Sequence, residues 1–302
     1  MAIKIAWGKQ YAHSLPAGHR FPMVKYELIP EQLLHEGTVE PDVFFAPEPL
    51  SEVDVLRIHE REYWEKLKGL ALTRQEERRT GFPLSAALVE REVVIAGGTL
   101  ACARFAVAEG TAALNVAGGT HHAYRGRGEG FCLLNDLALT AEILLQEAVV
   151  QRVLVVDLDV HQGNGTAAIF EGDPRVFTFS MHGAANYPMH KERSDLDVPL
   201  PDGIGDAAYL GLLREHLPRL LDEVAPDLVL YQAGVDILAT DKLGRLGVSR
   251  EGCLARDREV LGRCHAAGIP VVVTMGGGYS PDIRHIIDAH CGTFRVAAEF
   301  WG

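Results

Sequence analysis

Short runs of branched apolar residues alternate with longer, helix-like segments along most of the chain. The apolar runs have the length and composition of strands buried on both faces, and they cover residues 3–7, 113–117, 152–158, 176–181, 227–233 and 270–275. The longer segments, which we predict to be helices, cover residues 83–109, 136–147, 206–224 and 249–267. Strands that alternate with helices are typical of a parallel sheet with helices on both faces. The pattern therefore predicts a three-layer α/β fold, formed by one domain over residues 1–302.

Two polar stretches interrupt this alternation. Residues 37–51 contain three prolines and are predicted to form a surface loop. Residues 73–80 are rich in glutamate and arginine, and we predict an exposed connection there. Neither stretch has the composition of a linker between domains, so a single domain is still expected.

Composition narrows the class of protein. The chain is 47% hydrophobic and 23% charged, as soluble globular proteins are. Its net charge of −12 and lack of a long basic run argue against direct nucleic-acid binding and weakly favour cationic partners. No apolar run approaches the roughly 20 residues of a membrane span, and residues 1–7 do not resemble a signal peptide. Five cysteines without a C-x-x-C pair suggest reduced thiols and a cytoplasmic location.

The run at residues 152–158 ends in polar residues with a regular spacing. Asp157, Asp159 and His161 lie two residues apart, so an extended strand end turns their side chains to the same side. The glycines that follow allow a sharp turn close to a ligand. Because buried carboxylates need a partner, a metal ion is the simplest explanation for this cluster.

Polar clusters also follow the other predicted strands. Because ligands bind beyond the carboxyl ends of parallel strands, these clusters are expected to share one site. In chain order they are Gly118-Gly119-Thr120-His121-His122, Asp157-Leu158-Asp159-Val160-His161, Ser180-Met181-His182, Gly234-Val235-Asp236 and Gly276-Gly277-Gly278-Tyr279.

Asp159, His161 and Asp236 form a candidate set of three metal ligands. Either aspartate alone would equally suit a helix cap or a turn, but two oxygens and one nitrogen with an open position fit a catalytic metal. Zinc is the first choice and Fe²⁺ the alternative, because these ligand types do not separate them. A second metal is not expected, since Gly163 stands where a further carboxylate would be needed.

The adjacent His121 and His122 are candidates for the base and the acid that hydrolysis at a metal requires. Asp157 is a candidate anionic partner for one imidazole, and Asn164 is a candidate neutral partner for the other. An anionic partner raises the pKa of an imidazole more than an amide does. The two histidines are therefore expected to divide the two roles.

Three aromatic residues complete the candidate site. Tyr279 follows three glycines that permit close approach of the backbone to a ligand, and its phenol is a candidate donor to an oxyanion. Phe131 and Tyr187 are candidates for the walls of an apolar passage, although aromatic residues often belong to the core.

These motifs, in this order, resemble those of the zinc-dependent histone deacetylase family. The resemblance runs from about His19 to about Ala289 and includes Gly130-Phe131-Cys132-Leu133-Leu134-Asn135-Asp136 and Asp241-Lys242-Leu243-Gly244. The motif Gln162-Gly163-Asn164-Gly165 and the short chain length are most similar to those of the class IV branch and its bacterial relatives. The family implies an arginase–deacetylase fold, in which a mostly parallel eight-stranded sheet lies between two helix layers.

The resemblance also implies a reaction, which is hydrolysis of an acyl-lysine amide by metal-activated water. The implied zinc ligands are Asp159, His161 and Asp236. The implied catalytic residues are His121, His122, Tyr279, Asp157 and Asn164. The implied substrate contacts are Gly130, Phe131, Tyr187, Gly277 and Gly278. A structural K⁺ or Na⁺ is implied at Asp157 and Ser180.

Three departures from the family pattern are visible. Many members have an aspartate where this chain has Asn164, so the partner of His122 is uncharged here. In several deacetylases of the family, an acidic residue at the rim of the active site binds the substrate backbone, and this residue has no clear counterpart in residues 79–86. Lys25 or Arg20 is the candidate for the arginine that lines the product cavity of the family.

The sequence therefore predicts a metal-dependent amidohydrolase that removes an acetyl or longer acyl group from lysine side chains of a protein or peptide. One alternative is hydrolysis of acetylpolyamines or other small acylated amines. Another is a non-catalytic module that binds acyl-lysine. The intact His121, His122 and Tyr279 favour catalysis, because binding alone does not need them.

Overall fold

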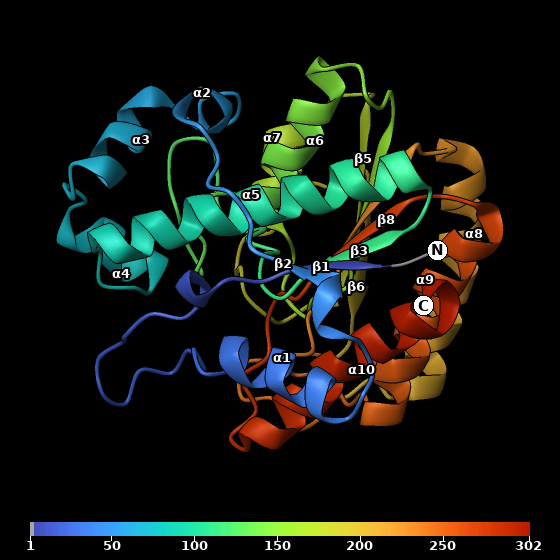
Figure 1. Ribbon diagram of the computed structural model, residues 1–302. Coiled ribbons are helices and arrows are strands. Elements are labelled where there is room, and N and C mark those ends of the chain that lie inside the picture. The colour runs from blue at the N-terminus through green and yellow to red at the C-terminus, as the bar shows by residue number, and fades with distance from the viewer. Residues whose placement is uncertain (1–2) are drawn as a thin grey trace.

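Eight strands form one sheet in the computed structural model, which describes residues 3–302 (Figure 1). The strands are β1 (Lys4–Ala6), β2 (Phe44–Phe45), β3 (Ala112–Asn115), β4 (Val153–Asp157), β5 (Val176–Gly183), β6 (Leu196–Leu200), β7 (Leu228–Gln232) and β8 (Val271–Thr274). Their order across the sheet is β2-β1-β3-β8-β7-β4-β5-β6, and every neighbouring pair is parallel. The predicted parallel sheet is confirmed.

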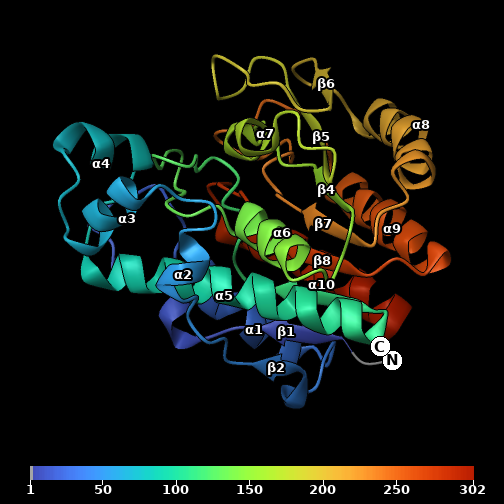
Figure 2. The same ribbon diagram turned by 90° about the horizontal axis from the view of Figure 1, so that it is seen from above.

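Helices cover both faces of this sheet (Figures 1 and 2). One layer contains α5 (Ala86–Glu109), α6 (Asp136–Gln146) and α7 (Asn164–Phe170), and α5 packs on β1, β3 and β8. The other layer contains α1 (Lys25–His35), α8 (Asp206–Val224), α9 (Arg250–Ala267) and α10 (Ile283–Trp301). The short elements are α2 (Glu52–Val55), α3 (Arg61–Lys68), α4 (Arg74–Thr80), η1 (Lys9–Tyr11) and η2 (Pro41–Val43). Within residues 3–302, no helix is long and apolar enough to span a membrane.

The central strands are buried on both faces, as their continuous apolar composition predicts. Every residue of β3, β4, β7 and β8 is buried. The edge strands β2 and β6 are only partly buried, and β6 contains Pro199, which an edge position tolerates. The strong sequence signals therefore belong to the middle of the sheet.

All six predicted strands and all four predicted helices are present, with ends that differ by up to three residues. Residues 73–80, predicted to be an exposed connection, are mostly exposed, but they form the helix α4. Thr73 and Glu76 form a reciprocal capping box, and Gly81 ends the helix at a φ of 79°. Residues 37–51 are mostly loop, as predicted, but they also contain η2 and β2.

The strand order determines where chemistry can occur. Because all strands are parallel, the carboxyl ends of β3, β8, β7 and β4 lie side by side at one edge of the sheet. The polar clusters that follow these strands are therefore neighbours, although they are far apart in the sequence. Open parallel sheets bind ligands at this edge.

Candidate active site

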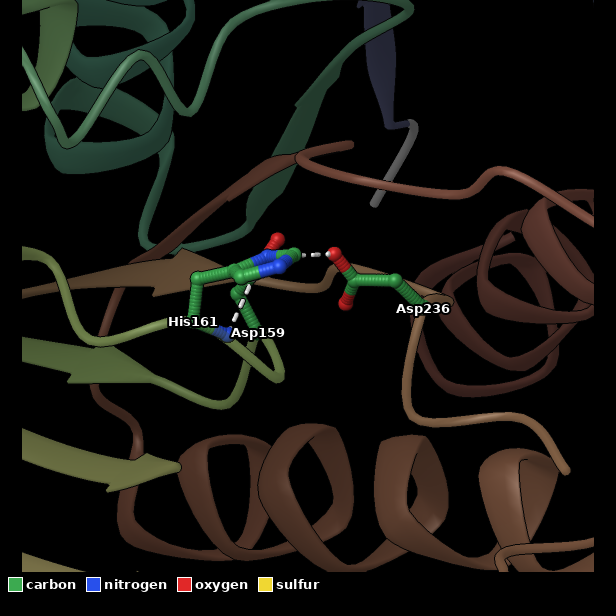
Figure 3. A group of neighbouring side chains, drawn as sticks. All are labelled: Asp159, His161 and Asp236. Carbon is green, nitrogen blue, oxygen red and sulfur yellow. Dashed lines mark hydrogen bonds and ion pairs between the residues drawn. The ribbon is translucent and has the colours of Figure 1, made fainter. Parts of the chain in front are cut away.

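Three side chains with metal-binding atoms converge beyond β4 and β7 (Figure 3). Asp159 and His161 follow β4, and Asp236 follows β7. The Nδ1 atom of His161 lies 3.0 Å from Asp159 Oδ1 and 3.1 Å from Asp236 Oδ2. Within residues 3–302, this is the one group of three His, Cys, Asp or Glu residues whose ligand atoms lie within 4.8 Å of one another.

Backbone N–H groups hold both carboxylates in place. Asp159 accepts hydrogen bonds from the N–H groups of His161 at 2.9 Å and Gly277 at 2.8 Å. Asp236 accepts one from Val160 at 2.9 Å. Position 277 requires glycine, because a Cβ atom there would overlap the Asp236 carboxylate. The loops at the strand ends thus orient the ligand oxygens in advance.

The spacing and charge of this group fit a divalent cation. Ligand atoms ~2.0–2.1 Å from a tetrahedral zinc lie ~3.3 Å from one another, close to the separations seen here. Burial lowers the pKa of His161, but hydrogen bonds to Asp159 and Asp236 outweigh burial and raise it to about 10. The two carboxylates therefore favour a positive charge between them. Three protein ligands leave a fourth position open, as catalytic metal sites do.

His121 lies beside these ligands and has a charged partner. Its Nδ1 donates to Asp157 Oδ2 at 2.6 Å, and its Nε2 faces Asp159 at 4.0 Å. Burial lowers the pKa of His121, but the charge and the hydrogen bond of Asp157 outweigh it and raise the pKa to about 8. The imidazole is therefore mostly protonated at neutral pH.

His122 has a neutral partner. Its Nδ1 donates to Asn164 Oδ1 at 2.6 Å, and Asn164 Nδ2 donates onward to Glu129 Oε1 at 2.7 Å. Because a carboxylate only accepts, Glu129 fixes the orientation of the Asn164 amide and places the His122 proton on Nδ1. Burial, followed by the charges of His121 and His161, holds the pKa of His122 well below its usual value. His122 is therefore neutral, with Nε2 able to accept a proton.

Asp136, the first residue of α6, fixes the loop that carries both histidines. Its carboxylate accepts hydrogen bonds from the N–H groups of Gly119 at 3.0 Å and Thr120 at 2.8 Å. Gly118 and Gly119 have φ angles of 80° and 75°, which side chains other than glycine rarely adopt. This turn brings the two imidazole rings to 4.1 Å from each other, both facing inward.

Tyr279 lies on the β8 side of the site. Its N–H donates to Asp241 Oδ2 at 2.6 Å, and its ring lies 5.8 Å from the ring of Phe131. Burial and the carboxylates of Asp236 and Asp159 hold the pKa of its phenol well above the usual value. The phenol therefore stays protonated and can donate a hydrogen bond to a substrate oxygen.

Two cavities meet at these groups. An inner cavity of about 40 Å³ and an outer pocket of about 400 Å³ share His122, His161, Gly130, Phe131 and Tyr279 in their walls. The predicted wall residue Tyr187 lines the outer pocket, and the predicted contact Gly277 lines the inner cavity. The predicted contact Gly278 lines neither of them, and a Cβ atom at this position would overlap the side chain of Val235.

Arg91 from α5 is the arginine that lines the inner cavity, and Lys25, one of the two predicted candidates, contacts Gly276 in the wall of this cavity. Arg20 lines the outer pocket. Lys25 is buried and donates from Nζ to the carbonyl oxygen of Gly276 at 3.0 Å. Because α5 reaches the site from a later part of the chain, matching positions near the N-terminus could not identify Arg91.

Asp157 and Ser180, the residues predicted to hold a monovalent cation, are paired in the register of β4 and β5. Their side chains have other partners. Asp157 accepts from His121, and Ser180 Oγ lies 2.9 Å from His182 Nδ1. The cation stays a prediction.

Glu129 is a neighbour of the site that the sequence pattern did not indicate. Glu129 is buried, and it accepts hydrogen bonds from Asn164, from the Tyr187 hydroxyl at 2.7 Å and from Arg127 Nε at 3.2 Å. It thereby links the partner of His122 to the wall of the outer pocket. The position of Glu129 directly before Gly130 is the one sequence feature that could have indicated its role. Its contacts could not be predicted, because they come from segments that are far apart in the sequence.

Comparisons with known proteins agree with this geometry. A family model described as histone deacetylase domain matches residues 19–293. An uncharacterised protein of Picosynechococcus sp. is 44% identical over 301 residues, which cover 100% of both chains. Histone deacetylase 2 of Arabidopsis thaliana is 32% identical, over 89% of this chain and 72% of the relative. Type-1 histone deacetylase 1 of Dictyostelium discoideum is 27% identical, over 94% of this chain and 60% of the relative.

Solved structures share the fold. The HDA15 HD domain matches with a TM-score of 0.82 and 21% identity, over 97% of this chain and 90% of that one. An HDAC homolog in complex with SAHA matches with a TM-score of 0.83 and 23% identity, over 99% and 84% of the two chains. The predicted arginase–deacetylase fold is thereby confirmed. Because the domain match spans most of the chain, this protein belongs to the histone deacetylase family and is a deacetylase-type hydrolase.

Proposed function

We propose that this protein is a zinc-dependent deacylase that removes acetyl or longer acyl groups from lysine side chains. Family membership supports the reaction class, and Asp159, His161 and Asp236 fit the implied metal. The observation that carries the proposal is the pair of adjacent imidazoles beside these ligands, one bonded to the carboxylate of Asp157 and the other to the amide of Asn164. A module that only binds acyl-lysine has no need for such a pair.

The protein groups divide the work of hydrolysis. Bound zinc would supply Lewis-acid polarisation of the acyl carbonyl and lower the pKa of water toward ~7. His122 accepts the proton of the attacking water, because its Nε2 is unprotonated. His121 carries a positive charge and donates a proton to the leaving amine. Tyr279 donates a hydrogen bond to the acyl oxygen as negative charge develops there.

The shape of the site supports an extended amine chain as the substrate. Phe131 and Tyr187 line the outer pocket, and the imidazoles lie where the pocket meets the inner cavity. The inner cavity is the place for the acyl group. Acyl-lysine in a protein or peptide is the proposed substrate. Fe²⁺ is the alternative metal, because it fits the same three ligands. The proposal also includes a structural K⁺ or Na⁺ bound at Asp157 and Ser180.

A substrate panel tests the proposal. Protein stripped of metal is assayed with zinc or Fe²⁺ on lysine peptides that carry acetyl to long fatty acyl groups, and on acetylated diamines. Metal-dependent release of the acyl group from lysine peptides is expected. If only the acetylated diamines are hydrolysed, the substrates are small acylated amines and not acyl-lysine. Binding of acyl-lysine without turnover under any metal would contradict catalysis.

A further inference from the structure

The outer pocket carries an unusual set of charges. Its walls contain Arg20, Arg78 and Arg79 but no aspartate or glutamate. All three arginines are exposed. Within residues 3–302, none of their guanidinium groups has a carboxylate at ion-pair distance, whereas most other arginines of the protein are paired. The mouth of the pocket therefore presents positive charge that the protein itself does not neutralise.

The acidic residues of α4 and the one that precedes Gly130 are engaged elsewhere. Glu76 is paired with Lys66 and caps α4. Glu77 accepts a hydrogen bond from the N–H of Leu84. Glu129 lies below the mouth, and its oxygens accept from three donors already described. Within residues 3–302, none of these carboxylates lies at ion-pair distance from the three guanidinium groups.

Backbone contacts hold the arginines beside the wall of the pocket. The carbonyl oxygen of Arg79 accepts from the N–H of Gly130 at 3.1 Å, and that of Thr80 accepts from Phe131 at 2.7 Å. The guanidinium carbon of Arg20 lies 5.0 Å from the centre of the Phe131 ring. The end of α4 is thus fastened to the segment that lines the pocket. The charges are part of the entrance and not of an independent loop.

This local charge is opposite to that of the whole chain, which is −12. A cluster of one sign at the entrance of a pocket steers oppositely charged ligands toward it. Guanidinium groups also bind carboxylates in a bidentate manner. Acetylated polyamines are cationic, so this entrance repels them.

We propose that the entrance selects acylated amines that carry a carboxylate at the end of the amine chain remote from the scissile amide. This inference rests on the proposed deacylase function and names its substrate class. The carboxylate has two possible sources, which are the α-carboxylate of free acyl-lysine and an acidic residue next to acyl-lysine in a peptide. In either case the arginines bind the carboxylate while the acyl-lysine chain lies between Phe131 and Tyr187.

Matched substrates with one acyl group test the selection. The set contains acetyl-lysine peptides with neutral, acidic or basic flanking residues, free Nε-acetyl-lysine and its carboxamide, and N-acetylputrescine. We expect kcat/KM to be about tenfold higher for acidic than for neutral peptides, mainly through KM, and to be lowest for the cations. About 0.5 M salt should reduce the difference, because exposed charges are screened. Free Nε-acetyl-lysine and its carboxamide differ only in the α-carboxylate. A higher kcat/KM for the free amino acid would identify this group as the source, whereas a preference seen only among the peptides would identify the acidic flanking residue.

Substitutions of the entrance arginines test whether these residues cause the preference for acidic peptides. Arg20→Gln and Arg79→Gln should each reduce the preference for acidic over neutral peptides by about three- to tenfold. Arg74→Gln is the matched control, because Arg74 is an exposed residue of the same helix outside the pocket walls. It should leave the preference unchanged. An equal loss in all three variants would contradict a specific role of the entrance.

The outcomes separate this inference from the proposed function. Normal turnover with equal kcat/KM for acidic and neutral peptides would overturn the inference and leave the function standing. If no substrate is hydrolysed, a binding assay on zinc-loaded protein replaces turnover, with two hydroxamates that end in a carboxylate or an amine. The inference would be supported, independently of the proposed function, if the hydroxamate with the carboxylate binds more tightly than the one with the amine. This difference in affinity should disappear in Arg20→Gln and Arg79→Gln. Equal binding would overturn the inference.

Discussion

His121 and His122 are neighbours in the chain, yet their surroundings give them opposite proton affinities. Burial lowers the pKa of both imidazoles, but the charged partner Asp157 outweighs it for His121 and raises that pKa to about 8. The neutral partner Asn164 cannot do the same for His122. Two residues of one type are thereby separated into an acid and a base by their environment.

The opposite affinities predict a bell-shaped pH dependence of kcat/KM. His122 has to be unprotonated, so activity rises with pH through its pKa, which lies well below 6.5. His121 has to be protonated, so activity falls as pH rises through its pKa of about 8. Steady-state kinetics from the lowest pH at which the protein stays folded to about pH 10 measure both limbs. A single limb that only rises with pH would contradict the role of His121 as acid.

The partner of His122 controls the acid limb. Asn164→Asp gives this imidazole a charged partner, and Glu129→Gln in the same protein removes the carboxylate that would repel the new one. The double variant should move the acid limb to higher pH and leave the alkaline limb in place, because a carboxylate raises the pKa of an imidazole. Glu129→Gln alone is the control. An unmoved acid limb would argue against His122 as base.

Tyr279 is expected to act through its hydroxyl. Tyr279→Phe keeps the ring against Phe131 but removes the donor to the acyl oxygen. We expect kcat to fall by roughly 10²–10³ with little change in KM, as for the loss of one oxyanion donor. Steady-state kinetics on an acetyl-lysine peptide measure this split. A rise in KM with unchanged kcat would show that the hydroxyl only binds substrate.

At the scale of elements, the metal ligands connect loops that follow different strands. Asp159 and His161 come from the end of β4, and Asp236 comes from the end of β7. The loop after β8 contributes the N–H of Gly277 to Asp159. A cation bound here links the ends of β4 and β7, and the hydrogen bond from Gly277 attaches the loop after β8 to the same ligand set.

Metal binding should therefore raise the melting temperature. An ion that binds only the native state stabilises it by about 2.7 kcal/mol at a concentration of 100 times its Kd. Calorimetry with and without a chelator measures the shift in Tm for the wild-type protein. Asp236→Asn, which removes one ligand, should show a much smaller shift. The same zinc-dependent shift in this variant would contradict Asp236 as a ligand.

The helix α4 depends on its cap more than on its packing, since only Thr80 of its residues is buried. Thr73→Ala removes the side chain that accepts the N–H of Glu76. The expected cost is about 1 kcal/mol in the free energy of unfolding of the helix or the protein. Urea unfolding measures it, with Thr73→Ser as a control that keeps the hydroxyl. An equal loss in both variants would show that the cap contributes nothing.

The elements that the sequence predicted are those with an unambiguous pattern. The central strands are continuously apolar because both of their faces are buried, so they were found. The helix α4 is polar on nearly every side, and α1 contains Pro30 in its interior, so neither resembled a helix. The edge strands β2 and β6 are short or contain proline. Their pairing is set by neighbours and not by their own sequence.

At the scale of the whole molecule, the metal ligands and the aromatic walls of the outer pocket could be predicted, and the charges of its entrance could not. Asp159 and His161 share one strand end, and parallel topology brings the end of β7 with Asp236 to the same edge. The entrance arginines come from residue 20 and from residues 78–79, and contacts of both segments with Gly130 and Phe131 bring them together. A net charge summed over the chain therefore had the opposite sign to the charge at the entrance.

The decisive measurement is hydrolysis of an acetyl-lysine peptide by metal-stripped protein, before and after addition of stoichiometric zinc. Zinc should restore turnover in the wild-type protein, while Asp236→Asn and Tyr279→Phe, folded to the same extent by circular dichroism, should stay far below it. That result would establish that the three ligands and the phenol act together in metal-dependent hydrolysis. Turnover that does not depend on metal, or that survives both substitutions, would contradict the proposed site.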